Sequence, residues 1–243
     1  MRIKTALLVV SLFCFVLLAE STAAASNVQA TAWTWGWGCS LNSQTQSGST
    51  TATAAASCLD LTGAGAQSSA FTLVTLDNKT PLNATIAVDT LSSVNNWNNT
   101  WAGATGSWSE SVIALGGAGQ GLLWMNYAIS GSMDWSGDSE VYEACLTTAT
   151  LSYCFQGPSG AVDVIPFTFG QPFDLAATFD AEVVASYGSA EAMLELGPPS
   201  YWFTDPSGNG IPGASLDLTP EPATLLLLTT GLLGVQRLLR RRQ

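Results

Sequence analysis

The sequence predicts an all-β fold: a single jelly-roll-like β-sandwich between an N-terminal signal peptide and one C-terminal transmembrane helix. Short runs of alternating apolar and polar residues recur between breaks rich in Gly, Ser, Thr and Asn, and no long stretch has helical periodicity. An apolar run at each end of the chain predicts the two flanking segments. We therefore divide the chain into 1–25, a signal peptide; 26–211, the sandwich; 212–219, a linker; and 220–243, a C-terminal tail.

The clearest strand runs from Phe173 to Tyr187. Every odd-numbered residue in it is apolar and most even-numbered residues are polar, which indicates one buried and one solvated face. We expect its odd-numbered residues, Phe179 among them, to lie in the core. Further strands are expected at 70–76, 84–91, 108–115, 122–129, 162–169 and 190–196, with a hairpin at 142–156.

The N-terminus has the parts of a secretory signal peptide. Arg2 and Lys4 precede an apolar run from Ala6 to Leu18, and small residues follow, with cleavage expected after Ala23 or Ala25. These features predict export through the Sec translocon and processing by signal peptidase.

Export leaves a strongly acidic segment. Between residues 26 and 219, one lysine, Lys79, stands against 16 acidic residues (18 less Glu20 and Glu221), a formal charge of −15. Such a field repels nucleic acid and anionic polymers, so we expect no nucleic-acid partner.

Four cysteines follow the signal peptide: Cys39, Cys58, Cys145 and Cys154. An even number in an oxidising compartment predicts two disulfides, with three connectivities open. We favour the local pairs Cys39–Cys58 and Cys145–Cys154, each worth roughly 2–3 kcal/mol on the loop-entropy model. The stretch 43–57 is then expected to be a flexible loop closed by the first pair. Zinc is disfavoured because the chain has no histidine and no CxxC spacing.

Trp33, Trp35 and Trp37 alternate along the chain, so they share one face of a strand. We expect an aromatic row in the core between two sheets, and a sugar-stacking platform is the alternative.

The densest group of carboxylates lies between 134 and 143. Asp134, Asp138 and Glu140 offer hard oxygen ligands and predict a calcium site, although a solvated turn between two strands explains the same residues. No other cofactor is expected. The chain has no histidine and no G-x-S-x-G elbow, so we expect a non-catalytic protein without catalytic residues. A carboxylate pair for glycoside hydrolysis is the remaining catalytic alternative.

The tail has three parts in a fixed order. Pro220, Glu221 and Pro222 favour an extended segment that displays the glutamate. An apolar run from Ala223 to Leu239 follows, 17 residues or about 25 Å of helix, short for a bilayer core of about 30 Å. The basic residues Arg237, Arg240, Arg241 and Arg242 then stop the helix on the cytoplasmic side.

This tail resembles the PEP-CTERM sorting signal of Gram-negative envelope proteins in its Pro-Glu-Pro element, its Leu-rich run 225–228, Gly231, Gly234 and the terminal arginines. The resemblance implies processing by exosortase, a membrane cysteine transpeptidase, near Pro-Glu-Pro. It implies a transient inner-membrane anchor through the C-terminal helix, then residence at the outer surface or in the extracellular matrix. A tail anchor without processing, or a buried terminal helix, is the alternative.

A looser resemblance to PEP-CTERM ectodomains lies in Phe167–Phe173, with the following long strand and the Asp205–Gly208 turn, and it implies a β-sandwich. We therefore expect a non-catalytic structural or adhesive protein of the cell envelope or matrix, with exopolysaccharide as a further partner. The alternative is a secreted carbohydrate-binding module, or a carboxylate-dependent glycoside hydrolase, carrying the same tail.

Overall fold

The computed structural model describes residues 26–36, 39–59, 66–77, 79–95 and 99–219, and all regular elements in these ranges are strands. The predicted all-β fold is therefore confirmed. The strands are β1 (Asn27–Gly36), β2 (Cys39–Gly48), β3 (Thr51–Leu59), β4 (Gln67–Leu76), β5 (Ala84–Val94), β6 (Thr100–Leu115), β7 (Gln120–Thr148), β8 (Ser152–Cys154), β9 (Ser159–Thr168), β10 (Pro172–Leu196), β11 (Ser200–Thr204) and β12 (Ser215–Leu218).

All twelve strands belong to one antiparallel sheet, whose main path runs β2-β1-β6-β10-β5-β4-β3. This sheet folds over on itself, so that β1 packs against β3 and β4, and β4 against β6, without hydrogen-bonding to them. The residues 26–218 form one compact unit. The predicted β-sandwich is thus refined: its two facing layers are halves of one continuous sheet.

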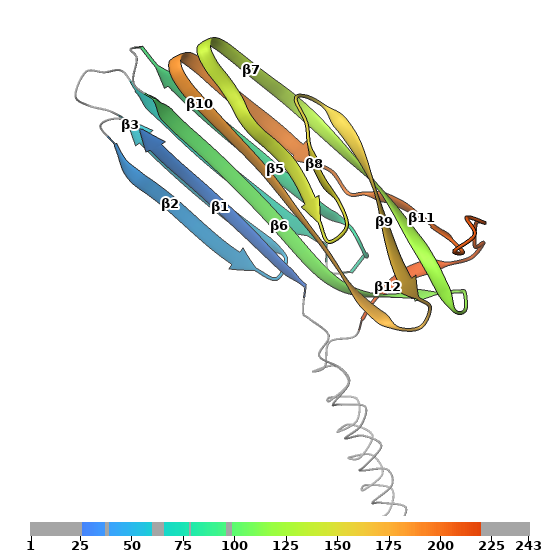
Figure 1. Cartoon of the computed structure of the whole chain (residues 1–243). Coiled ribbons are helices and arrows are strands. Elements are labelled where there is room, and N and C mark those ends of the chain that lie inside the picture. Colours follow the sequence, from blue (N-terminus) through green and yellow to red (C-terminus); the bar gives the residue numbers. More distant parts are fainter. Residues whose placement is uncertain (1–25, 37–38, 60–65, 78, 96–98, 220–243) are drawn as a thin grey trace, which may run out of the picture. The chain divides into compact units, whose positions relative to one another are not determined.

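Strand β10 is the element that joins the two halves (Figure 1). Its first part, from Pro172 to Ala185, pairs with β6, and its second part, from Gly188 to Leu196, pairs with β5 on the same edge. Strand β7 follows the opposite edge from Ala177 to Leu196. The long alternating strand expected from Phe173 is confirmed, and the segment 190–196 is its continuation, not a separate strand.

The passage between the halves is marked by two facing glycines. Gly188 of β10 lies opposite Gly137 of β7, next to a register shift, and both have positive φ (124° and 65°). A Cβ on Gly188 would lie 2.1 Å from the carbonyl oxygen of Ser136. Only a residue without a side chain lets the two backbones approach this closely while turning.

The core between the halves differs in character along its length. One part is aromatic: Phe179 stacks on Phe155 with centroids 5.8 Å apart, and Phe167 stacks on Phe173 at 5.4 Å. The other part is built from alanines and buried hydroxyls, and there the Thr72 hydroxyl of β4 donates to the Thr31 carbonyl of β1, 2.8 Å away across the two halves. The alternation of small residues on β1, β3 and β4 allows the two halves to pack closely.

The hairpin of β2 and β3 nearly closes the sheet on its other side. The Asn42 side-chain amide donates to the Ser57 carbonyl (3.0 Å), and the Ala55 N–H donates to the Gln44 side-chain oxygen (2.8 Å). The expectation of a flexible loop over 43–57 is therefore wrong. Ser, Thr and Ala are compatible with strand as well as loop, and pairing with β1 and β4 decides the outcome.

Two further boundaries differ from expectation. The residues 212–219, expected as a linker, include β12, which pairs with β6 from Leu115 to Val112 and so belongs to the domain. Residues 134–140, expected as a solvated turn or a calcium loop, continue β7 because β10 pairs with them along one edge.

The predicted signal peptide and the predicted C-terminal helix lie outside the described residues. Within the described part of the chain, no helix has the length and apolarity needed to cross a bilayer.

Candidate functional site

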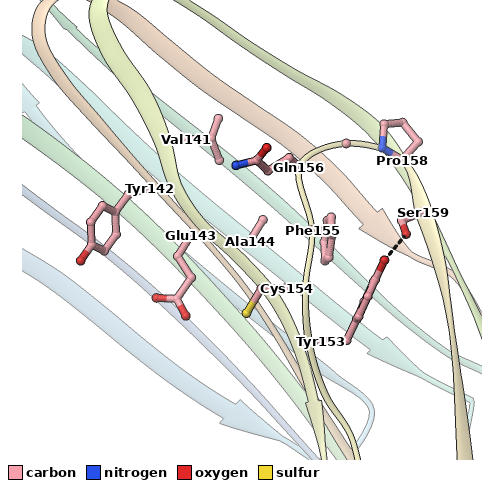
Figure 2. A pocket seen from close by; sticks show the side chains of 11 residues that line it. Val141, Tyr142, Glu143, Ala144, Tyr153, Cys154, Phe155, Gln156, Pro158 and Ser159 are labelled. Carbon is pink, nitrogen blue, oxygen red and sulfur yellow. Dashed lines mark hydrogen bonds between the residues drawn. The ribbon is translucent and has the colours of Figure 1, made fainter.

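A hollow opens where the second edge of β7 has no partner strand. Strand β9 pairs with β7 up to Ile129, and β8 pairs with it from Cys145, so the described strands leave the intervening edge free. The hollow has a volume of about 920 Å³ and is lined by residues 141–144 of β7 and by 153–159. Figure 2 shows Tyr142 and Glu143 on one side of it, and Pro158 and Ser159 on the other.

The wall formed by 153–159 is held by three contacts. The Sγ atoms of Cys145 and Cys154 are bonded, and these residues face each other across β7 and β8. The Phe155 N–H donates to the Ala144 carbonyl (3.0 Å), and the hydroxyls of Tyr153 and Ser159 are 3.1 Å apart (Figure 2). These contacts attach the wall to β7 and support the shape of the hollow.

The second predicted disulfide is only half described. Cys58 is disulfide-bonded, whereas the side chain of Cys39 lies outside the described residues. The Cys39–Cys58 pair stays a prediction.

The three residues predicted to bind calcium do not converge. Asp134, Asp138 and Glu140 are exposed and follow one another along β7, where a strand rises about 3.3 Å per residue. Within the described ranges, the one group of three candidate ligands within 4.8 Å of one another is Glu143 with Cys145 and Cys154. Those two sulfurs are committed to the disulfide, so they are not available as thiolate ligands.

A different set of carboxylates does gather, on the outer face of β10 and β7. Glu182 lies directly opposite Glu143, and Asp180 lies two residues away on the same face. Burial raises the pKa of Asp180 to about 6, with Glu143 and Glu182 adding to the effect. Burial also raises the pKa of Glu182, with a further contribution from Glu143. The face thus carries like charges that repel one another.

This repulsion predicts a pH-dependent response to Asp180→Asn. Because the folded-state pKa of Asp180 is raised, its contribution favours the folded state below about pH 4 and is lost as the pH rises through about 6. The substitution should therefore raise stability by about 0.5–1 kcal/mol at pH 7.5, after allowing for solvent screening, and the gain should shrink toward pH 4. Urea unfolding at both pH values measures it. Asp174→Asn, at an exposed position of the same strand, is the control, and an equal gain in both variants would contradict the assignment.

Among the described residues, the most buried carboxyl group makes a structural contact. Glu110 is 1% exposed in the core, and one of its oxygens accepts the N–H of Leu82 (2.9 Å), a residue held at a φ of 61°. Burial raises the pKa of Glu110, and the Leu82 N–H opposes that shift. Glu110 therefore holds the turn before β5 from within the core.

The alternating tryptophans lie on the outer face, so the expectation of a core row is wrong for Trp33 and Trp35. Trp35 is 44% exposed, and its ring lies against Trp101 of β6 with centroids 5.0 Å apart. Trp33 is half-buried, and Trp37 lies outside the described residues. The inward positions of β1 are instead Val28, Ala30, Ala32 and Thr34.

Sequence reasoning missed three members of this face. No strand was expected at Trp101, and nothing indicated that Asp180 and Glu182 share a face with Trp33. The register supplies the link, because Trp33 lies opposite Gly103 of β6, and Gly103 lies opposite Glu182 of β10. Asp180 and Glu182 alternate with buried residues, and this pattern indicated that both lie on the outer face. It did not indicate the order of the strands, which places them near Trp33.

Comparison with known proteins identifies the C-terminal end of the chain. The model of the PEP-CTERM protein-sorting motif matches residues 218–243, which include Pro220, Glu221, Pro222 and the four terminal arginines. No curated protein matches the chain. The residues 220–243 lie outside those that the structure describes, so the sorting residues are known from sequence alone. The match confirms the resemblance of the tail: the chain bears a PEP-CTERM sorting motif, which implies export to the cell envelope and exosortase-dependent sorting.

Proposed function

We propose that the domain of residues 26–218 has a non-catalytic, structural or adhesive role at the outer surface of the cell or in the extracellular matrix. The observation that carries the proposal is the display of polar and aromatic side chains on the outer face of β1, β6 and β10. Carboxylates on neighbouring strands of one face point the same way, whereas glycoside hydrolysis needs two carboxyl groups on either side of a bond. This geometry supports contact with a partner over hydrolysis.

Export and sorting deliver the domain to such a partner. The acidic charge of the exported segment keeps the domain soluble and repels anionic neighbours. A membrane anchor at the C-terminal end, removed near Pro220-Glu221-Pro222 by exosortase, accounts for the order of the tail's three parts. Cys145–Cys154 joins strands next to the hollow, as expected of an extracellular domain.

Sorting is tested with Glu221→Ala in the full-length chain, expressed in its native host. The wild-type chain should lose its tail, and the variant should accumulate at full length in the membrane fraction. Mass spectrometry of the C-terminal peptide and fractionation measure both. Unchanged cleavage and release of the variant would mean that Glu221 is not read by the sorting enzyme.

The adhesive role is tested by deleting the gene and measuring cell–cell attachment and the protein content of the matrix. We expect attachment to fall and the full-length gene to restore it, while the Glu221→Ala gene does not. Normal attachment in the deletion strain would contradict the role.

A further inference from the structure

Three tryptophan side chains lie together on the outer face of β1 and β6. Trp35 and Trp101 face each other across these strands, with their rings tilted by 38° and 5.0 Å apart. Trp33 lies opposite Gly103, where a Cβ would come within 2.3–2.5 Å of three indole atoms. The Trp33 indole therefore lies across the position of the side chain that Gly103 lacks. Together we call Trp33, Trp35 and Trp101 the tryptophan platform.

Polar groups surround the tryptophan platform on the same face. The hydroxyls of Thr31 and Thr45 are 3.2 Å apart next to it, on β1 and β2. Glu182 lies two strands from Trp33, a distance of about 10 Å, and Asp180 lies two residues before Glu182 on β10. Carboxylates accept hydrogen bonds and donate none when ionised. A ligand that fits this face has flat apolar surfaces for the rings and hydroxyl donors for the carboxylates.

From these contacts we propose that the tryptophan platform binds an uncharged polysaccharide. This polysaccharide would be the ligand of the proposed adhesive function. Sugar rings present C–H surfaces that pack on indole and hydroxyls that donate to Asp180 and Glu182. The charge of −15 on the exported segment disfavours anionic polymers at this face. The inference rests on the proposed function for its biological role and on the geometry of the face for its chemistry.

Charge also disfavours a second copy of the chain as the occupant. A two-fold contact through this face would bring the same patch of both copies together, so Asp180 and Glu182 of one copy would approach those of the other. Like charges opposite one another destabilise such a contact. A basic protein would gain from the carboxylates, and its attraction would weaken as salt screens it.

The test is affinity electrophoresis of the segment 26–219, which contains the whole compact unit, through gels that hold hydroxyethylcellulose, galactomannan or alginate. We expect at least one uncharged polymer to retard the wild-type protein. The retardation should be equal at low salt and in 0.5 M NaCl, where the electrostatic screening length is only about 4 Å. Alginate, an anionic polymer, should not retard it. Trp35→Ala should weaken the retardation about tenfold or more, because it removes an aromatic side chain from the contact.

Trp202→Ala is the matched control. Trp202 of β11 is 45% exposed, close to the 44% of Trp35, and it too stacks on a neighbour, Trp124, at 5.7 Å. This variant should be retarded like the wild type, and urea unfolding should show both variants folded.

Three results would overturn the inference: no retardation by either uncharged polymer, equal losses in Trp35→Ala and Trp202→Ala, or a dimer in sedimentation that Trp35→Ala abolishes. A failure of this inference can be distinguished from a failure of the proposed adhesive function. If attachment needs the protein while neither polymer binds, the polysaccharide is wrong and the adhesive role stands. If a polymer binds while the deletion strain attaches normally, the adhesive role is wrong and the binding stands.

Discussion

Phe179→Asp should strongly destabilise the segment 26–219. Phe179 is completely buried, stacks on Phe155 and lies between Gly106 of β6 and Leu146 of β7. The substitution places an unpaired charge in the core and removes a large aromatic side chain, so the loss should be at least about 4 kcal/mol. That is a large share of the 5–15 kcal/mol that typically stabilises a domain. Urea unfolding and near-ultraviolet circular dichroism measure it.

The control is Ala176→Asp, three residues earlier on β10. Ala176 is exposed on the outer face, opposite Ser109, so its charge stays in water and should cost under about 1 kcal/mol. Similar losses in both variants would mean that β10 does not present Phe179 to the core.

Gly188→Ala should destabilise the domain by about 2–4 kcal/mol. Its φ of 124° is rarely adopted by residues with a side chain, and the new Cβ would meet the Ser136 carbonyl oxygen 2.1 Å away. The neighbouring backbone cannot move aside without breaking the β7–β10 pairing where β10 passes from one half of the sheet to the other. The urea midpoint of the variant measures the cost.

Gly210→Ala provides the matched comparison. Gly210 has no atom within 4 Å of the added Cβ and does not have a positive φ. Its replacement should leave stability within about 0.5 kcal/mol of the wild type. A loss in Gly210→Ala equal to that in Gly188→Ala would show that the passage between the halves is not the source of the effect.

The long strand was predictable because its pattern is local. From Phe173 to Tyr187 the side chains alternate with a period of two. Strand β10 buries Leu175, Phe179 and Val183 as expected, whereas Tyr187 at the end of the pattern is 48% exposed and not in the core. Its full length was not predictable, since the alternation ends at Tyr187 and 190–196 was expected as a further strand. Pairing with β7 allows the chain to turn at Gly188 while the backbone hydrogen bonds continue beyond it. That pairing joins residues about 50 positions apart, so a local pattern does not reveal it.

The tryptophan row shows the limit of periodicity more sharply. Alternate spacing put Trp33 and Trp35 on one face, which is what the structure has, but it did not say which face points inward. The other positions of β1 held that information, since Val28, Ala30 and Ala32 are small and apolar and suit a close contact with β3 and β4. Size matters here because a row of indoles would not fit between halves packed this closely.

The acidic stretch was misread for a related reason. Charged and small residues from Asp134 to Glu143 are typical of a turn, yet they form a strand paired along one edge. The free edge explains the composition: charges and glycine irregularities such as Gly131 and Gly137 keep an exposed edge from pairing with other strands. The sequence showed the charges, and the strand order gives the reason for them.

The two ends of the domain have a mechanical consequence. Strands β1 and β12 share one edge of β6, where Asn27 lies opposite Ser109 and Leu218 lies opposite Val112. A pull on the chain at Leu218 therefore acts first on β12, which spans four residues, Ser215–Leu218. Its detachment would lengthen the connection by about 13 Å, at about 3.3 Å per residue, while β6 stays held between β1 and β10. A pull at this end is thus expected to release one short segment before the longer strands of the core come apart.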